Sequence, residues 1–296
     1  MRNQRNSAKK NIKSLGFILV VGLIVLILFN RFTKNNNNQR VDRSLEYVVQ
    51  NTLKGTKGIY GIVIKNLKTG EAYFTNEHRV YQPGSLYKIW IMATAFDQIK
   101  NGKLKEDEVL SEDVTVLNDK FNIASEEAEM TEGTITLVVS HALRQMLTIS
   151  HNYASFLLTA RVKHSSVRSF LTQNGFRESS LGEPPKTTPY DIALFFEKLY
   201  KEELTNLEYS NKMLGLLKEQ KLNDKLPKYL PQDTIIAHKT GEIDFFTHDA
   251  GIVYSPKGDY LIIVLSESDS PPQAKERIAE VSKAVYDYFQ NRKEKW

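Results

Sequence analysis

Residues 81–88 read YQPGSLYK, and they contain the pattern Ser-x-x-Lys at Ser85 and Lys88. Helical spacing follows, so Ser85 is expected at a helix start and on the same helix face as Lys88. A serine hydroxyl is a weak nucleophile that needs a base, and a lysine can be that base when burial lowers its pKa. The apolar residues after Lys88 favour such a setting. The pattern alone is weak evidence, because residues 7–10 (SAKK) match it too.

A second polar segment, Ser150-His151-Asn152, separates two helical patterns at 135–150 and 152–162. A loop serine and asparagine that point into a cleft could relay a proton and hydrogen-bond a substrate amide. The same letters also suit an ordinary helix–loop–helix connection with an N-cap. The segment alone leaves both interpretations open.

A third motif, Lys239-Thr240-Gly241, ends a β-like run. A lysine and a hydroxyl at a strand edge can bind a carboxylate, and a glycine lets a substrate backbone approach closely. The four letters KTGE also occur at residues 68–71, between two runs of alternating Val, Ile and Tyr. That copy is predicted to be the tip of a hairpin over 58–76, where turn geometry explains it.

The order of the elements predicts the fold class. The hairpin is followed by helical patterns, with ends expected near Asn101-Gly102 and Gly175, and by a helix that Thr188 should cap with Pro189 at its first position. Three β-like runs (233–243, 249–258, 259–268) and a long amphipathic helix (272–291) complete the chain. We expect an α/β (α+β) fold, with an antiparallel sheet built from both chain ends, flanked by helices, and an inserted all-helical lobe.

The three motifs follow one another at separations of 65 and 89 residues, each in the structural context that its chemistry needs. From about Leu45 onward the sequence resembles the class A β-lactamases and their penicillin-binding relatives, a superfamily of two-lobed serine hydrolases that includes DD-peptidases. The resemblance implies an acylated nucleophile, a base, a proton shuttle, binding groups for the substrate amide and carboxylate, and an oxyanion hole. By this resemblance Ser85 is the nucleophile, Lys88 its base and Ser150 the proton shuttle. Asn152 would bind the substrate amide, and Lys239 and Thr240, with Gly241 beside them, would bind its carboxylate. The backbone N–H groups of Ser85 and Glu242 would form the oxyanion hole.

Two departures from the family pattern affect the expected activity. His151 stands where the family usually has Asp, and we expect it to be structural. The family's deacylating Glu, in a Glu-x-x-Asn pattern, is missing from the loop GFRESSLGEPPKTTP (175–189), although Glu178 and Glu183 are present. Glu183 is the better candidate, because Pro184-Pro185 could hold it rigidly. The sequence therefore leaves three functions open: a β-lactamase, a D-Ala-D-Ala peptidase with slow deacylation, or a non-catalytic sensor of lactams or cell wall.

The amino-acid composition limits which cofactors and binding partners can be expected. The chain has no cysteine, which excludes disulfide bonds and catalysis by a thiolate. It also has no His-x-x-x-His pair, so we expect neither a bound metal nor another cofactor. The net charge of the chain is +5, but residues 1–43 alone have a net charge of +8, so the remaining residues have a net charge of −3. A mildly acidic domain gives no support for nucleic-acid binding. The expected partner is a β-lactam or a peptidoglycan stem peptide, bound by a monomer; Arg277 is a guess for an additional carboxylate-binding residue.

The N-terminal segment predicts a membrane anchor. Residues 14–32 (SLGFILVVGLIVLILFNRF) follow a basic tail and show no small-residue cleavage site. We expect a cytoplasmic tail at 1–13, a signal-anchor at 14–32, a linker at 33–44 and an extracytoplasmic domain at 45–296. Cleavage of a signal peptide and secretion is the alternative.

Overall fold

A five-stranded antiparallel sheet lies at the centre of the computed structural model, which describes residues 44–292. The strand order is β2-β1-β7-β6-β5. The bounds are β1 Ile59–Asn66, β2 Ala72–Thr75, β5 Ile236–Ile243, β6 Phe246–Val253 and β7 Tyr260–Glu267. Strand β1 pairs with β7, so that Ile62 lies opposite Val264. The sheet is therefore built from both ends of the domain, as predicted.

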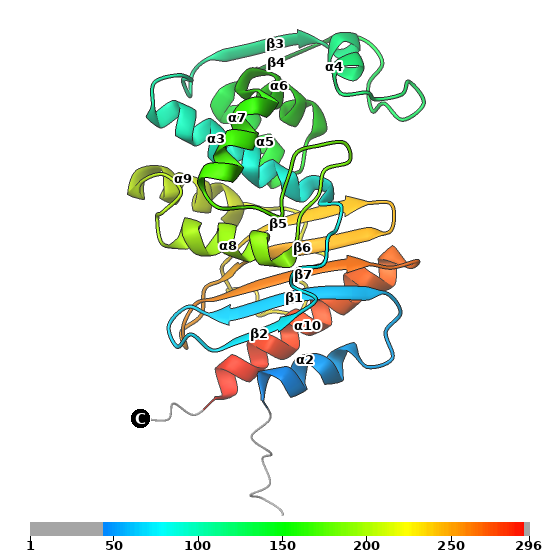
Figure 1. Ribbon diagram of the computed structural model, residues 1–296, viewed down its shortest axis with the longest axis vertical. Helices are drawn as coiled ribbons and strands as arrows, with labels where there is room; N and C mark the ends of the chain where they lie inside the picture. The colour runs from blue at the N-terminus through cyan, green and yellow to red at the C-terminus, as the bar shows by residue number, and fades with distance from the viewer. Residues whose placement is uncertain (1–43, 293–296) are drawn as a thin grey trace, which may run out of the picture. The chain divides into compact units, whose positions relative to one another are not determined.

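Helices cover both faces of this sheet (Figure 1). The first and last helices, α2 (Leu45–Leu53) and α10 (Pro271–Asn291), pack side by side on one face. On the other face α8 (Pro189–Tyr200) contacts the sheet, and the inserted lobe lies beyond it. The lobe contains α3 (Lys88–Lys100), α5 (Val139–Thr148), α6 (Asn152–Val162), α7 (His164–Gln173) and α9 (Leu207–Lys218).

The two faces of the sheet support two hydrophobic cores. Successive side chains of a strand point to opposite faces, so Ile62 and Ile64 enter the core under α2 and α10, whereas Val63 enters the larger core of the helical lobe. Trp90 and its neighbours on α3 are buried in that second core. Because α3 is enclosed on nearly all sides, the residues at its start are held in place by packing.

The inserted lobe also contains a small sheet that the sequence pattern did not reveal. Strands β3 (Val109–Asp113) and β4 (Thr134–Val138) pair, and α4 (Val114–Lys120) follows β3 directly. The apolar residues of β4 run without interruption into those of α5, so the pattern at 135–150 was interpreted as one helix. The predicted cap is confirmed: the Thr188 hydroxyl accepts the N–H of Asp191, and Pro189 opens α8.

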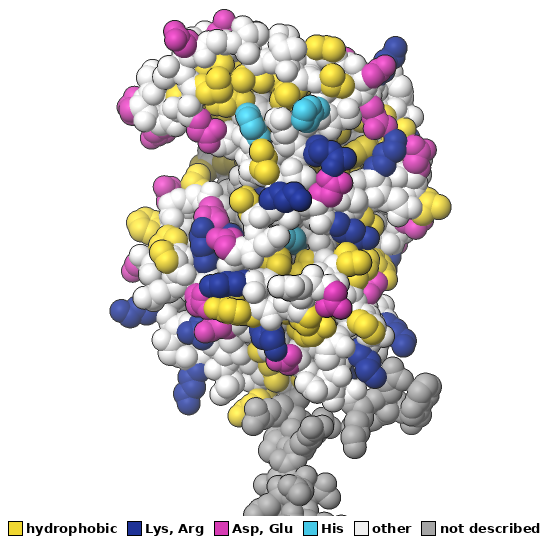
Figure 2. All heavy atoms as spheres, turned by 180° about the vertical axis from the view of Figure 1, so that it is seen from behind, with side chains coloured by type: hydrophobic (Ala, Val, Ile, Leu, Met, Phe, Trp, Pro, Cys, Tyr) yellow, Lys and Arg dark blue, Asp and Glu magenta, His cyan; other side chains and the backbone are white. Residues whose placement is uncertain are grey.

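The predicted tail, signal-anchor and most of the linker lie outside the described residues. Among residues 44–292, no helix has the length and apolar character needed to cross a membrane. Residues 45–296 group as one compact unit. On the face seen in Figure 2, basic and acidic side chains are interspersed, and the surface is notched on the left between the upper and lower parts of the molecule.

Candidate active site

Ser85 lies in a single 3-10 turn, η1 (Gly84–Tyr87), which leads directly into α3. Gly84 has a φ of +49°, and a Cβ at this position would lie 2.7 Å from the backbone nitrogen of Glu242. A Cβ on Gly241 would likewise lie 2.3 Å from the carbonyl oxygen of Pro83. Glycine is needed at both places, because the turn that carries Ser85 and strand β5 pack backbone against backbone.

Lys88 is the first residue of α3, and its side chain is completely buried. Its ammonium group donates to the Ser150 carbonyl oxygen at 2.6 Å, to the Ser150 hydroxyl at 3.1 Å and to Oδ1 of Asn152 at 2.8 Å. Burial lowers the pKa of Lys88 from 10.5 to about 7, and the Glu129 carboxylate partly opposes this shift. Near neutral pH, a large fraction of the molecules therefore holds a neutral amine that can accept a proton.

The loop between α5 and α6 presents Ser150 to this lysine. Ser150 has a φ of +60°, an uncommon backbone conformation for a residue with a side chain, and its hydroxyl accepts a hydrogen bond from Lys88. His151 caps α6, because its Nδ1 accepts the N–H of Ala154 at 3.2 Å. The ring thus takes the position of an ordinary capping side chain. The geometry supports the structural role expected for His151.

Lys239 approaches Ser150 from the opposite side. Its ammonium group donates to the Ser150 hydroxyl at 3.1 Å and to the carbonyl oxygen of Thr240 at 3.0 Å. Burial, reinforced by the like charge of Lys88, holds the pKa of Lys239 well below its ordinary value. One serine hydroxyl therefore accepts hydrogen bonds from two buried lysines, which form a short path for a proton.

Ser85, Ser150 and Thr240 border a cavity of about 560 Å³. Its lining consists of Ser85, Ser150, Asn152, Lys221, Leu222, Asn223, Asp224, Thr240, Glu242 and Lys275. A cavity of this volume is in the range that holds a small organic molecule. The structure thus brings residues from the three sequence motifs to one place.

The far side of the cavity contains a network of two carboxylates and two lysines. Lys225 is fully buried and binds Asp224 at 2.7 Å and Glu242 at 2.6 Å. Lys275, from α10, binds Glu242 at 2.7 Å and Asp224 at 3.2 Å. Burial alone would raise the pKa of the Glu242 carboxyl group, but the hydrogen bonds from Lys225 and Lys275 outweigh it and lower that pKa. The Glu242 side chain is thus committed to ion pairs.

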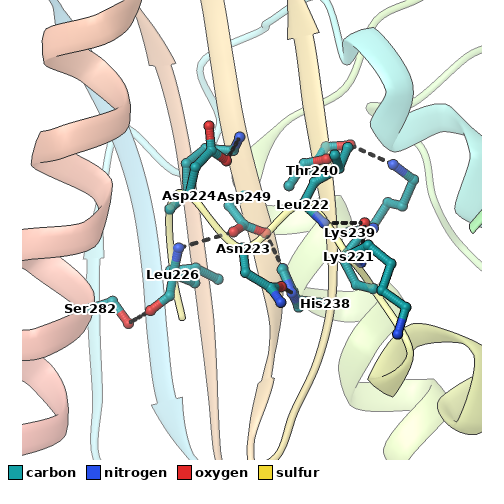
Figure 3. Close-up of polar contacts among 12 residues, drawn as sticks. Lys221, Leu222, Asn223, Asp224, Leu226, His238, Lys239, Thr240, Asp249 and Ser282 are labelled. Carbon is teal, nitrogen blue, oxygen red and sulfur yellow. Dashed lines mark hydrogen bonds and ion pairs between the residues drawn. The ribbon is translucent and has the colours of Figure 1, made fainter. Parts of the chain in front are cut away.

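The segment between α9 and β5 forms one wall of the cavity and is fastened to the sheet below it (Figure 3). Asp249 on β6 accepts the N–H of Leu226 at 3.0 Å and is hydrogen-bonded to His238 at 2.8 Å. The second ring nitrogen of His238 lies 3.1 Å from Oδ1 of Asn223. Ser282 of α10 donates to the carbonyl oxygen of Leu226 at 2.7 Å. These contacts fix the wall with groups that lie beneath it.

Glu183 and Arg277 lie apart from this group. Glu183 is exposed, accepts a hydrogen bond from Asn122 at 3.3 Å, and does not line the cavity. Its loop is closed by paired backbone hydrogen bonds between Ser180 and Lys186, which keeps it short. Arg277 donates to the carbonyl oxygen of Thr52, on the face of the sheet covered by α2 and α10, and does not line the cavity either.

Four charged residues of the site were not predicted from the sequence: Glu129, Asp224, Lys225 and Lys275. None of them belongs to a short motif, because each comes from a connecting segment or from the start of α10. The sequence signal that could have indicated the ion pairs is the match of charges, since Asp224-Lys225 lies in the segment that leads to β5 and Glu242 lies near the end of that strand. Only the fold brings Lys275 to them.

The site combines a serine at a helix start, a buried lysine with a lowered pKa, a second serine bonded to two lysines, and a cationic strand edge. Such a set can activate a hydroxyl as a nucleophile and return a proton to a leaving group. The backbone of Glu242 packs against the turn that carries Ser85.

The comparisons with known proteins identify the family of the chain. The sequence profile of the β-lactamase enzyme family matches residues 44–289. The chain therefore belongs to the β-lactamase enzyme family, among the serine hydrolases related to class A β-lactamases. Beta-lactamase VEB-1 of Pseudomonas aeruginosa is 24% identical over 91% of this chain and 97% of its own.

Solved structures share the fold. PBP-A superposes with a TM-score of 0.73 at 21% identity, over 84% of this chain and 96% of that one. A β-lactamase from Sphaerobacter thermophilus DSM 20745 superposes with a TM-score of 0.74 at 20% identity, over 84% and 98% of the two chains. A class A β-lactamase from Bacteroides cellulosilyticus DSM 14838 gives 0.73 at 21% identity, over 86% and 100%. The two-lobed architecture predicted from the sequence is confirmed by these similarities.

Proposed function

We propose that the protein opens β-lactam amides through a covalent acyl intermediate on Ser85. The observation that carries this proposal is that two buried lysines donate hydrogen bonds to Ser150, which lines the same cavity as Ser85. VEB-1 is described as a β-lactamase, and the acyl-enzyme complex of the L158E mutant of PBP-A holds penicillin G in the same fold. We propose the same class of ligand for this cavity.

In the proposed reaction the Ser85 hydroxyl attacks the lactam carbonyl carbon while its proton passes to the neutral amine of Lys88. A carbon–oxygen bond forms, and the oxyanion is held by the N–H groups of Ser85 and Glu242. When the carbon–nitrogen bond breaks, the Ser150 hydroxyl gives its proton to the ring nitrogen and recovers one from a neighbouring lysine. The substrate carboxylate would bind at Lys239 and Thr240, and its amide at Asn152.

The short 175–189 loop favours a second candidate, a penicillin-binding peptidase that acts on D-Ala-D-Ala stem peptides and deacylates slowly. Neither Glu178 nor Glu183 lines the cavity. Glu178 is instead held by Thr188 at 2.6 Å and by His78 at 2.9 Å. Without a carboxylate from this loop to activate water, an acyl-enzyme formed with a β-lactam would persist.

The experiment is a time course of intact mass for residues 44–296 mixed with a penicillin. A mass increase by one penicillin on the wild type and none on Ser85→Ala supports acylation of Ser85. An adduct that disappears within minutes with rapid turnover indicates a β-lactamase, whereas a stable adduct indicates the slow-deacylating peptidase. Absence of an adduct on the wild type, or an equal adduct on Ser85→Ala, would refute the proposal.

We further propose that the domain acts outside the cytoplasm as a monomer, tethered by residues 14–32. The support is the basic tail followed by an apolar run in the sequence. Full-length protein should remain with the membrane fraction and be digested by protease added to the outer surface. Release of a shortened chain into the medium would instead indicate signal cleavage.

A further inference from the structure

The side-chain amide of Asn152 is held from two sides. Its Oδ1 accepts a hydrogen bond from Lys88 at 2.8 Å, and its Nδ2 donates to Oε1 of Glu129 at 2.7 Å. An ammonium group offers only donors and a carboxylate only acceptors, so both partners select the same orientation of the amide. The Nδ2 end, which borders the cavity wall, therefore always lies against a carboxylate.

Glu129 reaches this position because its neighbour in the chain is fixed. The carbonyl oxygen of Met130 accepts hydrogen bonds from the Tyr153 hydroxyl at 2.7 Å and from Asn118 at 2.8 Å. The Met130 N–H is 3.1 Å from the same Tyr153 oxygen. Tyr153 is buried at the start of α6, next to Asn152. The segment that carries Glu129 is thus fastened to the helix that carries the amide.

Glu129 lies behind Asn152 and does not itself line the cavity, and its pairing differs from that of the two carboxylates that do. Asp224 and Glu242 are each paired with Lys225 and Lys275. Within residues 44–292, no ion pair involves Glu129, and its hydrogen-bond partner is the neutral amide of Asn152. Its charge also reaches the reaction centre, since it opposes the lowering of the Lys88 pKa. Asn152, which lines the amide-binding end of the cavity, is therefore backed by a carboxylate that forms no ion pair among the described residues.

We propose that Glu129 makes this end of the cavity selective for acyl groups that carry an ammonium group beside the amide carbonyl. This inference rests on the proposed function, in which Asn152 binds the substrate amide. The NH₂ group of Asn152 has two donors, so the substrate carbonyl can bind one while Glu129 keeps the other. A cation on the carbon next to that carbonyl then lies near the carboxylate, whereas an anion there is repelled.

Three penicillins that differ in the substituent on this carbon test the proposal: ampicillin (ammonium), benzylpenicillin (hydrogen, uncharged) and carbenicillin (carboxylate). The second-order rate constant of acylation is measured at about pH 6.5, below the ordinary pKa of about 7.7 for an α-amino group. We expect the order ampicillin, benzylpenicillin, carbenicillin, with steps of about threefold to fivefold, the size given by a partly exposed charge pair.

The variant Glu129→Gln keeps an oxygen that accepts the Asn152 hydrogen bond and removes only the charge. The three rate constants should then converge to within about twofold, which a purely structural role of Glu129 would not cause. The control is Glu127→Gln, an exposed glutamate two residues away, which should preserve the order. Equal rates on the wild type, or an unchanged spread in Glu129→Gln, would overturn the inference alone. No acylation by any of the three would overturn the proposed function and this inference with it.

Discussion

Replacing Lys88 by methionine should abolish acylation and change how stability depends on pH. Methionine has a similar length and no charge, so its side chain would fill the buried position of Lys88 at the start of α3. The pKa of Lys88 is about 7 in the folded protein and 10.5 as its ordinary value. Between these values the unfolded chain binds about one proton more than the folded one, so the wild type gains stability as pH rises. Below pH 7 both states are protonated and this gain is absent.

The size of the effect follows from the shift. For these two pKa values, proton linkage gives the wild type about 2.5 kcal/mol of additional stability between pH 6 and pH 9, which Lys88→Met should lack. Loss of the hydrogen bonds to Ser150 and Asn152 lowers the variant's free energy of unfolding by a similar amount at every pH. This loss therefore does not affect the change in stability between pH 6 and pH 9. Removal of the like charge raises the pKa of Lys239 in the variant, which flattens its curve further.

Urea unfolding of both proteins at pH 6, 7, 8 and 9 measures this difference. Acylation by a penicillin over the same range should rise through a midpoint near pH 7 in the wild type and remain undetectable in the variant. Parallel stability curves for the two proteins would show that Lys88 keeps its proton in the folded state. The reasoning about a neutral amine as the base would then be refuted.

Three further predictions concern the two KTG segments, a close backbone contact and the loop carboxylate. Lys239→Ala should reduce the acylation rate at least about tenfold, because it removes the hydrogen bond to Ser150. Lys68→Ala, at the hairpin tip, should leave the rate unchanged. Equal effects of the two changes would contradict the assignment of the second KTG segment to the active site. Gly241→Ala should lower the free energy of unfolding by roughly 1–3 kcal/mol and slow acylation, because the new Cβ would press on the carbonyl oxygen of Pro83; an unaltered Tm would refute this. Glu183→Gln should leave deacylation within about twofold of the wild type by time-resolved intact mass, because a side chain outside the cavity cannot activate its water; a large loss would return the role of base to Glu183.

The sequence was informative where chemistry and local structure depend on neighbouring letters. Ser85 and Lys88 are three residues apart on one turn, and Thr188 and Pro189 mark a helix start directly, so both features could be predicted. The relation of Lys239 to Ser150 required the order of the motifs and the resemblance to a family as well. Contacts made only by the fold could not be predicted, because nothing near Lys275 in the chain indicates that α10 delivers it to Glu242. The same holds for Glu129, which reaches Asn152 through the attachment of Met130 to Tyr153.

A small difference in local pattern explains why the pair of strands β3 and β4 was not predicted. Thr134–Val138 alternates like a strand, but its apolar residues continue into α5, and the strand partner at Val109–Asp113 contains two acids and a serine. A short, half-exposed pair of strands at the edge of a lobe carries little periodic signal. The exposed position of Glu183 depends on the backbone hydrogen bonds that close its loop. No single residue in the sequence predicts these bonds.

The pairing of β1 with β7 also determines when the protein becomes active during its synthesis. Ile62 finds its partner Val264 only after about two hundred further residues have been made, and β5, which carries Lys239, comes late as well. Such distant pairings close slowly, because chain entropy opposes them until the last strands arrive. The Ser85 turn therefore gains the backbone of β5 among the final steps of folding. A chain cut short before residue 267 would carry the serine and its lysine without a working site, so an incomplete product is inactive toward its substrate.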